Sequence, residues 1–289
     1  MVLFAAAISV SFSLGHLAAP HIAPVALAAL RFLIAAVLLG VAVIKIIDRK
    51  HLQSSWRYLI VGGLLAGYFI LMFEALQLTD PISTSAVFTL TPLLSALFGY
   101  VLLRQITTVN MAVSLVIAAV GALWVIFRGD IEALLGLRFG LGEQIFFIGC
   151  AMHALYTPMG RLLNRGEPLL VYSFASICGG LLVTTAYGSQ QIFTTNWLQL
   201  PLVAWVAAFY LGIFATAFTV FLVQYATLRL PSAKVMAYGY LVPVFVILWE
   251  GILGHGWVKF IVLPGAAAIV LALVFLITDS NASEMSSQS

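Results

Sequence analysis

The sequence predicts an all-α integral membrane protein with ten transmembrane helices in two inverted five-helix repeats. Three observations predict this fold: the composition, a series of apolar runs, and a segment that recurs. Of the 289 residues, 63% are hydrophobic and 8% are charged, and the mean hydropathy is +1.12. A soluble domain carries about 25% charged residues. Ten spans of about 20 residues use about 200 positions, which leaves room for short connections and tails but excludes a large soluble domain.

Apolar runs separated by turn-like or polar breakers define the ten expected helices in order. The breakers include PHIAP, TDP, RQITT, GEP, LPSA and GHG. The expected helices are 2–19, 24–47, 56–78, 82–103, 108–127, 142–164, 168–188, 202–228, 232–254 and 257–277. We expect the first run to be a retained span rather than a signal peptide, because the first Lys or Arg is Arg31 and no basic segment precedes the run.

Basic residues are distributed unevenly over the two expected sides of the membrane. The N-terminal side carries nine of them: Lys45, Arg49, Lys50, Arg57, Arg104, Arg161, Arg165, Arg229 and Lys234. The other side carries Arg128, Arg138 and Lys259. The positive-inside rule then places both termini in the cytoplasm. The polar residues 279–289 are expected to form a disordered cytoplasmic tail.

One segment recurs at an offset of 151 residues. Residues 75–96 align without gaps to 226–247, with identities at Ala75/Ala226, Ala86/Ala237, Leu90/Leu241 and Pro92/Pro243. Counted within each half of five helices, both segments cover the end of the third helix and most of the fourth. Halves with an odd number of spans face in opposite directions, as in secondary transporters that bind substrate near the midplane. The expected organisation is a first repeat at 1–128, a loop at 129–141 and a second repeat at 142–278.

Several classes of function are excluded by what the sequence lacks. The net charge of +3 is scattered, without the basic stripe that nucleic-acid binding requires. Cys150 and Cys178 have no CxxC spacing, so we expect no metal site or other cofactor. HExxH, GxSxG and GxxxxGK[ST] do not occur, which argues against an enzyme and against direct use of ATP. The expected partners are a small-molecule solute and the lipid bilayer; a channel remains an alternative.

Pro92 and Pro243 lie near the middle of the fourth and ninth spans. A proline inside a helix frees a carbonyl and kinks the helix, which a membrane tolerates where neighbours or water satisfy it. The matched positions in the two halves favour a pair of hinges over ordinary membrane prolines.

Four ionisable residues lie inside expected spans, where an unpaired charge costs a few kcal/mol or more. His153 lies near the midplane and could bind or titrate with substrate, or be satisfied by a neighbouring helix. Arg31 is expected to snorkel, to pair with a carboxylate, or to form an outer gate with Glu74 or Glu250. Each of these two carboxylates could instead hold a substrate ammonium group or simply be solvated at the rim.

Helical spacing places further candidates beside these groups. Tyr156 shares a face with His153, and Tyr240 shares one with Glu250, so both tyrosines could stack on an aromatic solute. The remaining binding candidates are two residues of the first span, His16 and Ser13, and two more tyrosines, Tyr68 and Tyr238. Packing between helices is the alternative explanation of such faces.

The chain resembles the drug/metabolite transporter superfamily in its ten-helix EamA family. The resemblance rests on APVALAALRFLIAAVLL (23–39), which includes Pro24 and Arg31-Phe32, and on LTPLLSALFGYVLL and LVPVFVILWEGILG. It departs from the family at Arg104-Gln105 and His255-Gly256, where the family often has Gly-Glu. Within the family the chain is most similar to bacterial aromatic and neutral amino-acid exporters.

The resemblance implies a central cavity between spans 1–4 and 6–9, and export across a bacterial inner membrane. The leading hypothesis is therefore an amino-acid exporter that works by alternating access. The alternative is an exporter of cationic drugs or other small metabolites, which would need an intramembrane carboxylate. Phosphorylated sugars are disfavoured, because Arg31 is the only basic residue found inside a span.

Overall fold

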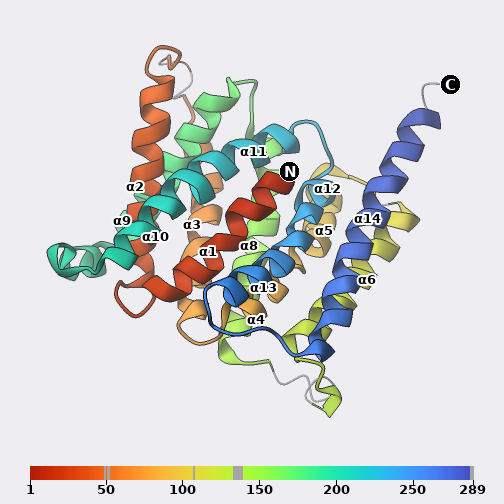
Figure 1. The fold of residues 1–289 in the computed structure, drawn as a ribbon. Coiled ribbons are helices and arrows are strands. Elements are labelled where there is room, and N and C mark those ends of the chain that lie inside the picture. Colours follow the sequence, from red (N-terminus) through yellow and green to blue (C-terminus); the bar gives the residue numbers. More distant parts are fainter. Residues whose placement is uncertain (49, 51–52, 107, 133–138, 287–289) are drawn as a thin grey trace.

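The computed structural model describes residues 1–48, 50, 53–106, 108–132 and 139–286, with side chains to Leu276, and this part of the chain is all helical. Figure 1 shows one bundle in which long helices cross at steep angles. Arg49 and Arg138 of the charge count, positions 133–138 of the expected inter-repeat loop and the last three tail residues lie outside the described residues.

Six of the expected spans are single α-helices, and a seventh, α9, is one helix with a kink. They are α1 (Val2–Ala18), α2 (Pro24–Val43), α3 (Trp56–Leu76), α6 (Val109–Ile126), α8 (Leu141–Leu163), α9 (Leu169–Thr194) and α14 (Leu263–Ser286). The kink lies at Gly188, where the backbone leaves helical geometry (φ −102°, ψ 17°), and α9 continues past the expected end of its span. Helix α14 begins later than expected, after the short 3₁₀ helix η5 (Phe260–Val262). It also covers positions expected to be a disordered tail, because an established helix extends one residue at a time at little cost.

The other three spans are built from consecutive shorter helices. The fourth is α4 (Pro81–Phe88) and α5 (Thr91–Leu103). The eighth is α10 (Leu202–Gly212), the π-helix η3 (Ile213–Phe218) and α11 (Thr219–Thr227). The ninth is α12 (Ser232–Ala237), the 3₁₀ helix η4 (Tyr238–Leu241) and α13 (Val242–Ile252). A further 3₁₀ turn, η2 (Trp197–Gln199), precedes α10.

The two prolines of the recurring segment explain two of these interruptions. Pro92 and Pro243 each occupy the first turn of a half-helix, α5 and α13, rather than the middle of a continuous helix. A proline ring clashes with the carbonyl four residues earlier, which here belongs to Phe88 and Gly239. Helix α4 ends at Phe88, and Gly239 lies in the 3₁₀ stretch η4. Each α-helix is therefore interrupted at the residue whose carbonyl the proline ring would contact.

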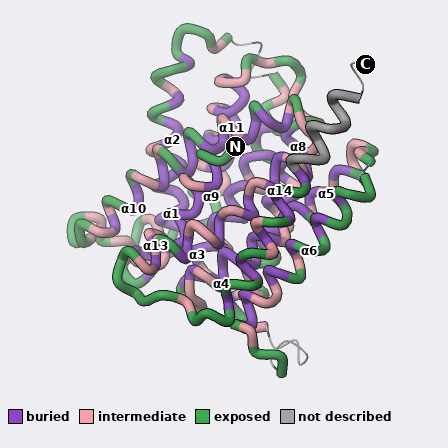
Figure 2. Tube along the Cα trace, turned by 45° about the vertical axis from the view of Figure 1, so that its right-hand side comes forward, coloured by how far each residue is buried: buried purple, intermediate pink, exposed green. Residues whose placement is uncertain are grey.

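Within the described part of the chain, seven helical segments are long and apolar enough to cross a membrane: 24–43, 56–76, 81–103, 109–126, 169–194, 202–227 and 232–252. Two shorter apolar helices cover Val2–Ala18 and Phe260–Leu276. Helix α8 is as long as these segments but is not one of the seven, and its more polar residues include Glu143, His153 and Arg161. Buried positions concentrate where helices face one another, and exposed positions lie on the outside (Figure 2). Many of the exposed positions carry large apolar side chains.

Helix α3 is central to the packing and lies against both α8 and α9. Helix α2 packs on α9, α1 lies between α10 and α13, and α6 pairs with α14 at one edge of the bundle (Figure 1). The contact between α3 and α9 is backbone to backbone. A Cβ at Gly62 would collide with the carbonyl of Ser176, and one at Gly179 with the carbonyl of Tyr58.

Candidate functional site

A stack of buried rings occupies the junction of α3, α4 and α8. The His153 ring lies 4.3 Å from that of Tyr68 at 25° and 5.9 Å from that of Tyr156 at 8°. Phe88 of α4 approaches His153 to 5.4 Å. We call these four residues the aromatic stack. Three of the predicted binding residues, His153, Tyr68 and Tyr156, therefore lie together, and of the two tyrosines only Tyr156 was expected beside the histidine.

Further aromatic rings extend the stack toward neighbouring helices. Phe69 lies 4.8 Å from Tyr68 between ring centroids, and Phe146 lies 5.8 Å from Tyr68. Phe12 of α1 contacts Phe88 at 6.0 Å and Phe146 at 5.8 Å. Such edge and offset contacts favour aromatic pairs beyond the area that they bury. The environment is thus apolar and aromatic on several sides.

Two polar atoms of the aromatic stack lack hydrogen-bond partners among the described residues. They are the Tyr68 hydroxyl and Nδ1 of His153, although both side chains are almost fully buried. The Tyr156 hydroxyl, by contrast, accepts a 3.0 Å hydrogen bond from Nε2 of Gln224. A buried polar group without a partner costs about 1–3 kcal/mol. The stack therefore holds hydrogen-bonding capacity that a polar ligand could satisfy.

A polar cavity of about 730 Å³ lies at the opposite end from the α2–α3 connection; we call it the vestibule. Its charged and titratable lining residues are His16, His21, Asp80, Arg128, Glu250, His255 and Lys259. Oε2 of Glu250 lies 2.8 Å from Nδ1 of His255, and Oε1 of Glu250 is buried without a partner in the described part of the chain. Nδ1 of His16 lies 2.8 Å from the Leu76 carbonyl.

Asp80 has two roles at the rim of the vestibule. It caps α4 by accepting hydrogen bonds from the backbone of Ile82 and Ser83, and it pairs with the Arg128 guanidinium at 2.5 Å. Burial alone would raise the pKa of the Asp80 carboxyl, but these hydrogen bonds and the arginine charge outweigh it and lower the pKa. Asp80 is therefore a charged carboxylate that is held in place by the first turn of α4 and by Arg128.

Arg31 lies in neither of these places and has no carboxylate partner in the ion pairs of the described residues. It is fully buried, its Nε donates to the Thr216 hydroxyl at 2.8 Å, and its Nη2 donates to the Ala215 carbonyl at 2.9 Å. The expected snorkelling and the expected pair with Glu74 or Glu250 are both replaced by contacts to η3. The π-helix presents a hydroxyl and a carbonyl toward α2, which the sequence pattern does not reveal.

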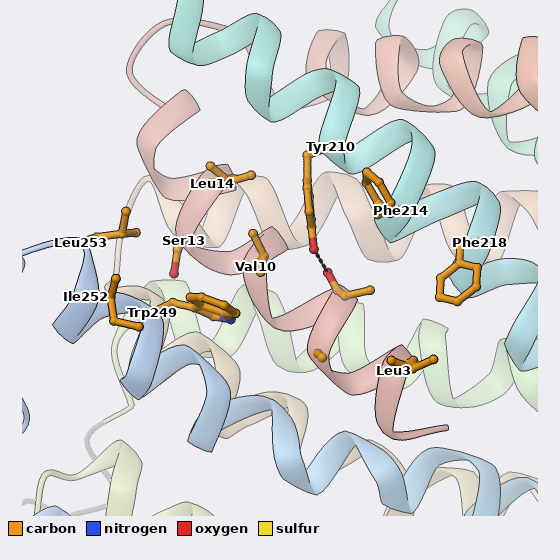
Figure 3. A pocket seen from close by; sticks show the side chains of 12 residues that line it. Leu3, Val10, Ser13, Leu14, Tyr210, Phe214, Phe218, Trp249, Ile252 and Leu253 are labelled. Atoms are coloured by element: carbon orange, nitrogen blue, oxygen red, sulfur yellow. Dashed lines mark hydrogen bonds between the residues drawn. The ribbon is translucent and has the colours of Figure 1, made fainter.

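An apolar groove of about 600 Å³ lies between α1, η3 with α10, and α13 (Figure 3). Tyr210 crosses to α1, where its hydroxyl donates to the Ala7 carbonyl at 3.2 Å. Ser13 lines this groove, and its buried Oγ has no partner in the described structure. Trp249, also in the groove, donates from Nε1 to the Ser9 hydroxyl at 3.0 Å.

The predicted binding residues therefore separate into different places instead of forming one cavity. His153, Tyr156 and Tyr68 meet in the aromatic stack, Glu250 and His16 line the vestibule, and Ser13 lines the groove. Tyr240 is buried in η4 with its hydroxyl unpartnered, and its neighbour Gly239 lies against Phe88. Tyr238 and Glu74 are half-buried.

The binding candidates drawn from the sequence did not include Phe88, Phe69 or His255. The phenylalanines carry no polar atom that distinguishes them from packing residues. His255 belongs to the GHG segment that separates two expected spans, so it was not considered with the residues inside spans. Its position five residues after Glu250 could have indicated the contact between the two side chains.

Comparison with known proteins gives a family and a fold. Residues 1–127 and 140–278 match the EamA-like transporter family. An uncharacterized transporter of Bacillus subtilis (strain 168), YyaM, is 25% identical over 271 residues, which cover 91% of this chain and 88% of that protein. A solved structure, described only as a crystal structure of a protein, superposes with a TM-score of 0.73 over 95% of each chain at 20% identity. That likeness shows the fold alone.

Proposed function

Because the chain belongs to the EamA-like transporter family and is a multi-pass membrane transporter, we propose that it is a secondary transporter that exports amino acids, aromatic and other neutral ones, by alternating access. The observation that carries this proposal is the aromatic stack with its two unpartnered polar atoms. A stack of buried rings suits the side chain of an aromatic amino acid, and the polar atoms without partners suit its charged groups.

The proposed architecture is ten spans in two inverted repeats, with a central site between them. The family match supports it by falling in two segments, and corresponding helices of the two halves, α2 with α9 and α6 with α14, pack on each other. The broken fourth and ninth spans are proposed hinges, because a half-helix that begins with a proline can tilt without losing a backbone hydrogen bond.

We further propose a bacterial inner-membrane location with both termini in the cytoplasm. Lys45, Lys50 and Arg165 belong to connections at one end of the bundle, whereas Arg128 and Lys259 line the vestibule at the other. The positive-inside rule supports this orientation, and the vestibule then opens to the non-cytoplasmic side.

The test is counterflow of labelled L-phenylalanine into proteoliposomes that are preloaded with unlabelled amino acids. Saturable uptake that other aromatic and neutral amino acids inhibit is the expected result. Competent counterflow of another solute in place of phenylalanine would overturn the amino-acid assignment while the family stands. No flux of any solute, from protein shown to be folded, would contradict the carrier itself.

Glu250 favours the second candidate, an exporter of cationic drugs or other small metabolites. Glu250 lines the vestibule, and its carboxylate has one buried oxygen without a partner in the described residues; such a group can hold a cation. This function requires an intramembrane carboxylate. A double variant Glu74→Gln, Glu250→Gln that still transports would count against it.

A further inference from the structure

The guanidinium of Arg31 is a buried cation without a counter-charge. Its side chain is fully buried, and Nη1 has no hydrogen-bond partner among the described residues. The Phe69 ring covers one face of the guanidinium, with Cζ 3.4 Å from the ring centroid. A cation over a ring gains attraction, but a ring does not neutralise a charge in a low-dielectric interior.

Arg57 in α3 shows how the same bundle treats a buried arginine that has a structural role. Its guanidinium donates to Oε1 of Glu167 at 2.6 Å, and the two side chains are 3% and 7% exposed. Arg57 also donates to the Leu163 carbonyl at 2.6 Å. Its charge is therefore balanced within the chain. The difference from Arg31 is the missing carboxylate, since both arginines donate to backbone carbonyls.

The position of Arg31 connects it to the aromatic stack. Phe69, which covers the guanidinium, lies 4.8 Å from Tyr68, and Tyr68 stacks on His153 at 4.3 Å. Arg31 and Tyr68 are also close enough to interact electrostatically. The Arg31 guanidinium and the Tyr68 ring thus both lie beside Phe69, and each side chain carries a donor without a partner in the described residues.

Arg31 also bridges the two halves of the chain. It belongs to α2, whereas both of its hydrogen-bond acceptors belong to η3. A π-helix turn is uncommon and occurs frequently at functional sites. A ligand that competed with the Ala215 carbonyl for the guanidinium would therefore weaken a contact between halves.

We propose that Arg31 binds the carboxylate of the transported solute. This inference rests on the proposed function and names the group that the solute must carry. The carboxylate supplies the counter-charge that the chain lacks, accepts hydrogen bonds from Nη1 and a second guanidinium nitrogen, and leaves the solute side chain toward the aromatic stack. Because guanidinium and carboxylate match as two parallel hydrogen bonds, the site selects carboxylates over amides and over amines.

The first test uses the unmodified protein and pairs of competitors. Phenylalanine counterflow is measured against L-phenylalaninamide and phenethylamine, which lack the carboxylate, and against phenylacetate, which keeps it. Phenylacetate should compete, and the two compounds without a carboxylate should compete at least about tenfold more weakly, since hydrogen bonds to charged groups contribute that much or more. Equal competition by the amide overturns the proposal.

The second test compares Arg31→Gln with Arg31→Lys and with a matched control, Arg57→Gln. Arg31→Gln should bring the ratio of phenylalanine to phenylalaninamide affinity close to one. Arg31→Lys, which keeps the charge, should retain part of the preference. Arg57→Gln removes an equally buried arginine and should lower stability without changing the ratio. An unchanged ratio in folded Arg31→Gln protein overturns the proposal, because a purely structural role changes stability and not selectivity.

A binding readout separates failure of this inference from failure of the proposed function. Where phenylalanine gives no flux, thermal melting of the purified protein is measured with a panel of small carboxylates and their amides. Stabilisation by a carboxylate and not by its amide, lost in Arg31→Gln, supports the anion site even though the amino-acid assignment has failed. Stabilisation by no carboxylate, or equally by acid and amide, overturns it.

Discussion

His153 combines two roles that can be separated by a single substitution. Its ring is part of the aromatic stack, and its Nδ1 is the unpartnered polar atom beside Tyr68. Alanine at this position would leave a cavity and destabilise the bundle, so loss of transport in that variant would be ambiguous. His153→Phe keeps a ring of similar size and removes the nitrogens.

We predict that His153→Phe lowers phenylalanine transport at least about tenfold, because a buried hydrogen bond to a charged group is lost, while the melting temperature stays within a few degrees. Counterflow and melting in detergent check the two parts. Tyr172→Phe serves as control, since it removes a buried hydroxyl outside the aromatic stack, one that donates to the Gly160 carbonyl at 2.9 Å. Wild-type transport by His153→Phe would show that its nitrogens take no part.

Glu167 contributes stability that depends on pH. Burial alone would raise the pKa of its carboxyl, but the Arg57 guanidinium and the backbone N–H of Arg165 outweigh that effect and lower the pKa below its ordinary value of 4.5. A carboxyl with a lowered folded-state pKa stabilises the fold fully above its unfolded-state pKa. The stability is lost as the pH falls through the folded-state pKa.

We therefore predict that the protein melts at a lower temperature as the pH falls below about 4.5, the unfolded-state value. Glu167→Gln should flatten this dependence and cost on the order of 2 kcal/mol at pH 7, between the values for exposed and buried pairs. Melting from pH 7 to pH 3 measures both effects. The exposed Glu132→Gln should reproduce the wild-type curve, and an unaltered slope in Glu167→Gln would refute the assignment.

At the scale of single residues, the sequence identified most polar members of the site but not their partners. Spacing on one helix placed Tyr156 beside His153, because that relation is local. The partners of Arg31 lie more than 180 residues away in sequence, on a π-helix. Helical periodicity carries no information about such a contact, so the expected carboxylate partner was wrong.

Among the elements, the broken fourth and ninth spans have a local cause. Pro92 and Pro243 open α5 and α13, so alanine at either position would allow a continuous helix by restoring one N–H donor and removing the ring. We predict that Pro243→Ala leaves the protein folded and slows turnover, because a continuous helix tilts less readily at η4.

The counterflow rate of Pro243→Ala relative to wild type measures turnover, and its melting temperature shows whether the protein is folded. Pro264→Ala is the matched control, since Pro264 lies exposed in the first turn of α14, outside the broken spans. Equal turnover in Pro243→Ala and wild-type protein would argue against a hinge at this position.

The crossing of α3 and α9 depends on two glycines. We predict that Gly179→Ala destabilises the protein by about 3 kcal/mol or more, because its Cβ would meet the Tyr58 carbonyl and backbone moves less readily than a side chain. Gly63→Ala should be neutral or mildly stabilising, since a Cβ there would lie 3.6 Å from Val183 Cγ2, an ordinary contact. Melting temperature and folded yield in detergent distinguish them; similar values for the two variants would contradict this account.

The helix positions could be read from the sequence because apolar runs of membrane length leave few alternatives. Most expected ends fall within a few residues of the observed ones, as for α5, which ends at Leu103 as expected. The differences lie where polar residues continue a helix, as in α9 beyond Gly188, and where a helix is interrupted without a proline, as at η3. The interruption at η3 coincides with contacts to a distant segment, since Arg31 of α2 donates to Ala215 and Thr216, whereas the end of α9 is largely exposed.

For the whole molecule, orientation in the membrane decides whether transport is export or import. The vestibule and the α2–α3 connection lie at opposite ends of the bundle (Figure 1), so labelling one residue at each end assigns both. Ser55 precedes α3, and Gln199 ends η2 in the connection after α9, which the proposed order of ten spans puts on the side opposite Ser55; both are exposed. Neither substitution by cysteine alters the number of Lys and Arg residues on which the expected orientation depends.

We predict that a membrane-impermeant maleimide labels Gln199→Cys in intact cells and labels Ser55→Cys only after permeabilisation. The native Cys150 and Cys178 are replaced by alanine in both variants, and transport by that background shows that the fold is kept. Because nine basic residues favour the side of Ser55 against three on the other, the reverse pattern would require the charge bias to be overridden. It would also place the vestibule in the cytoplasm, so that the Glu250–His255 pair would face the solute at entry instead of exit.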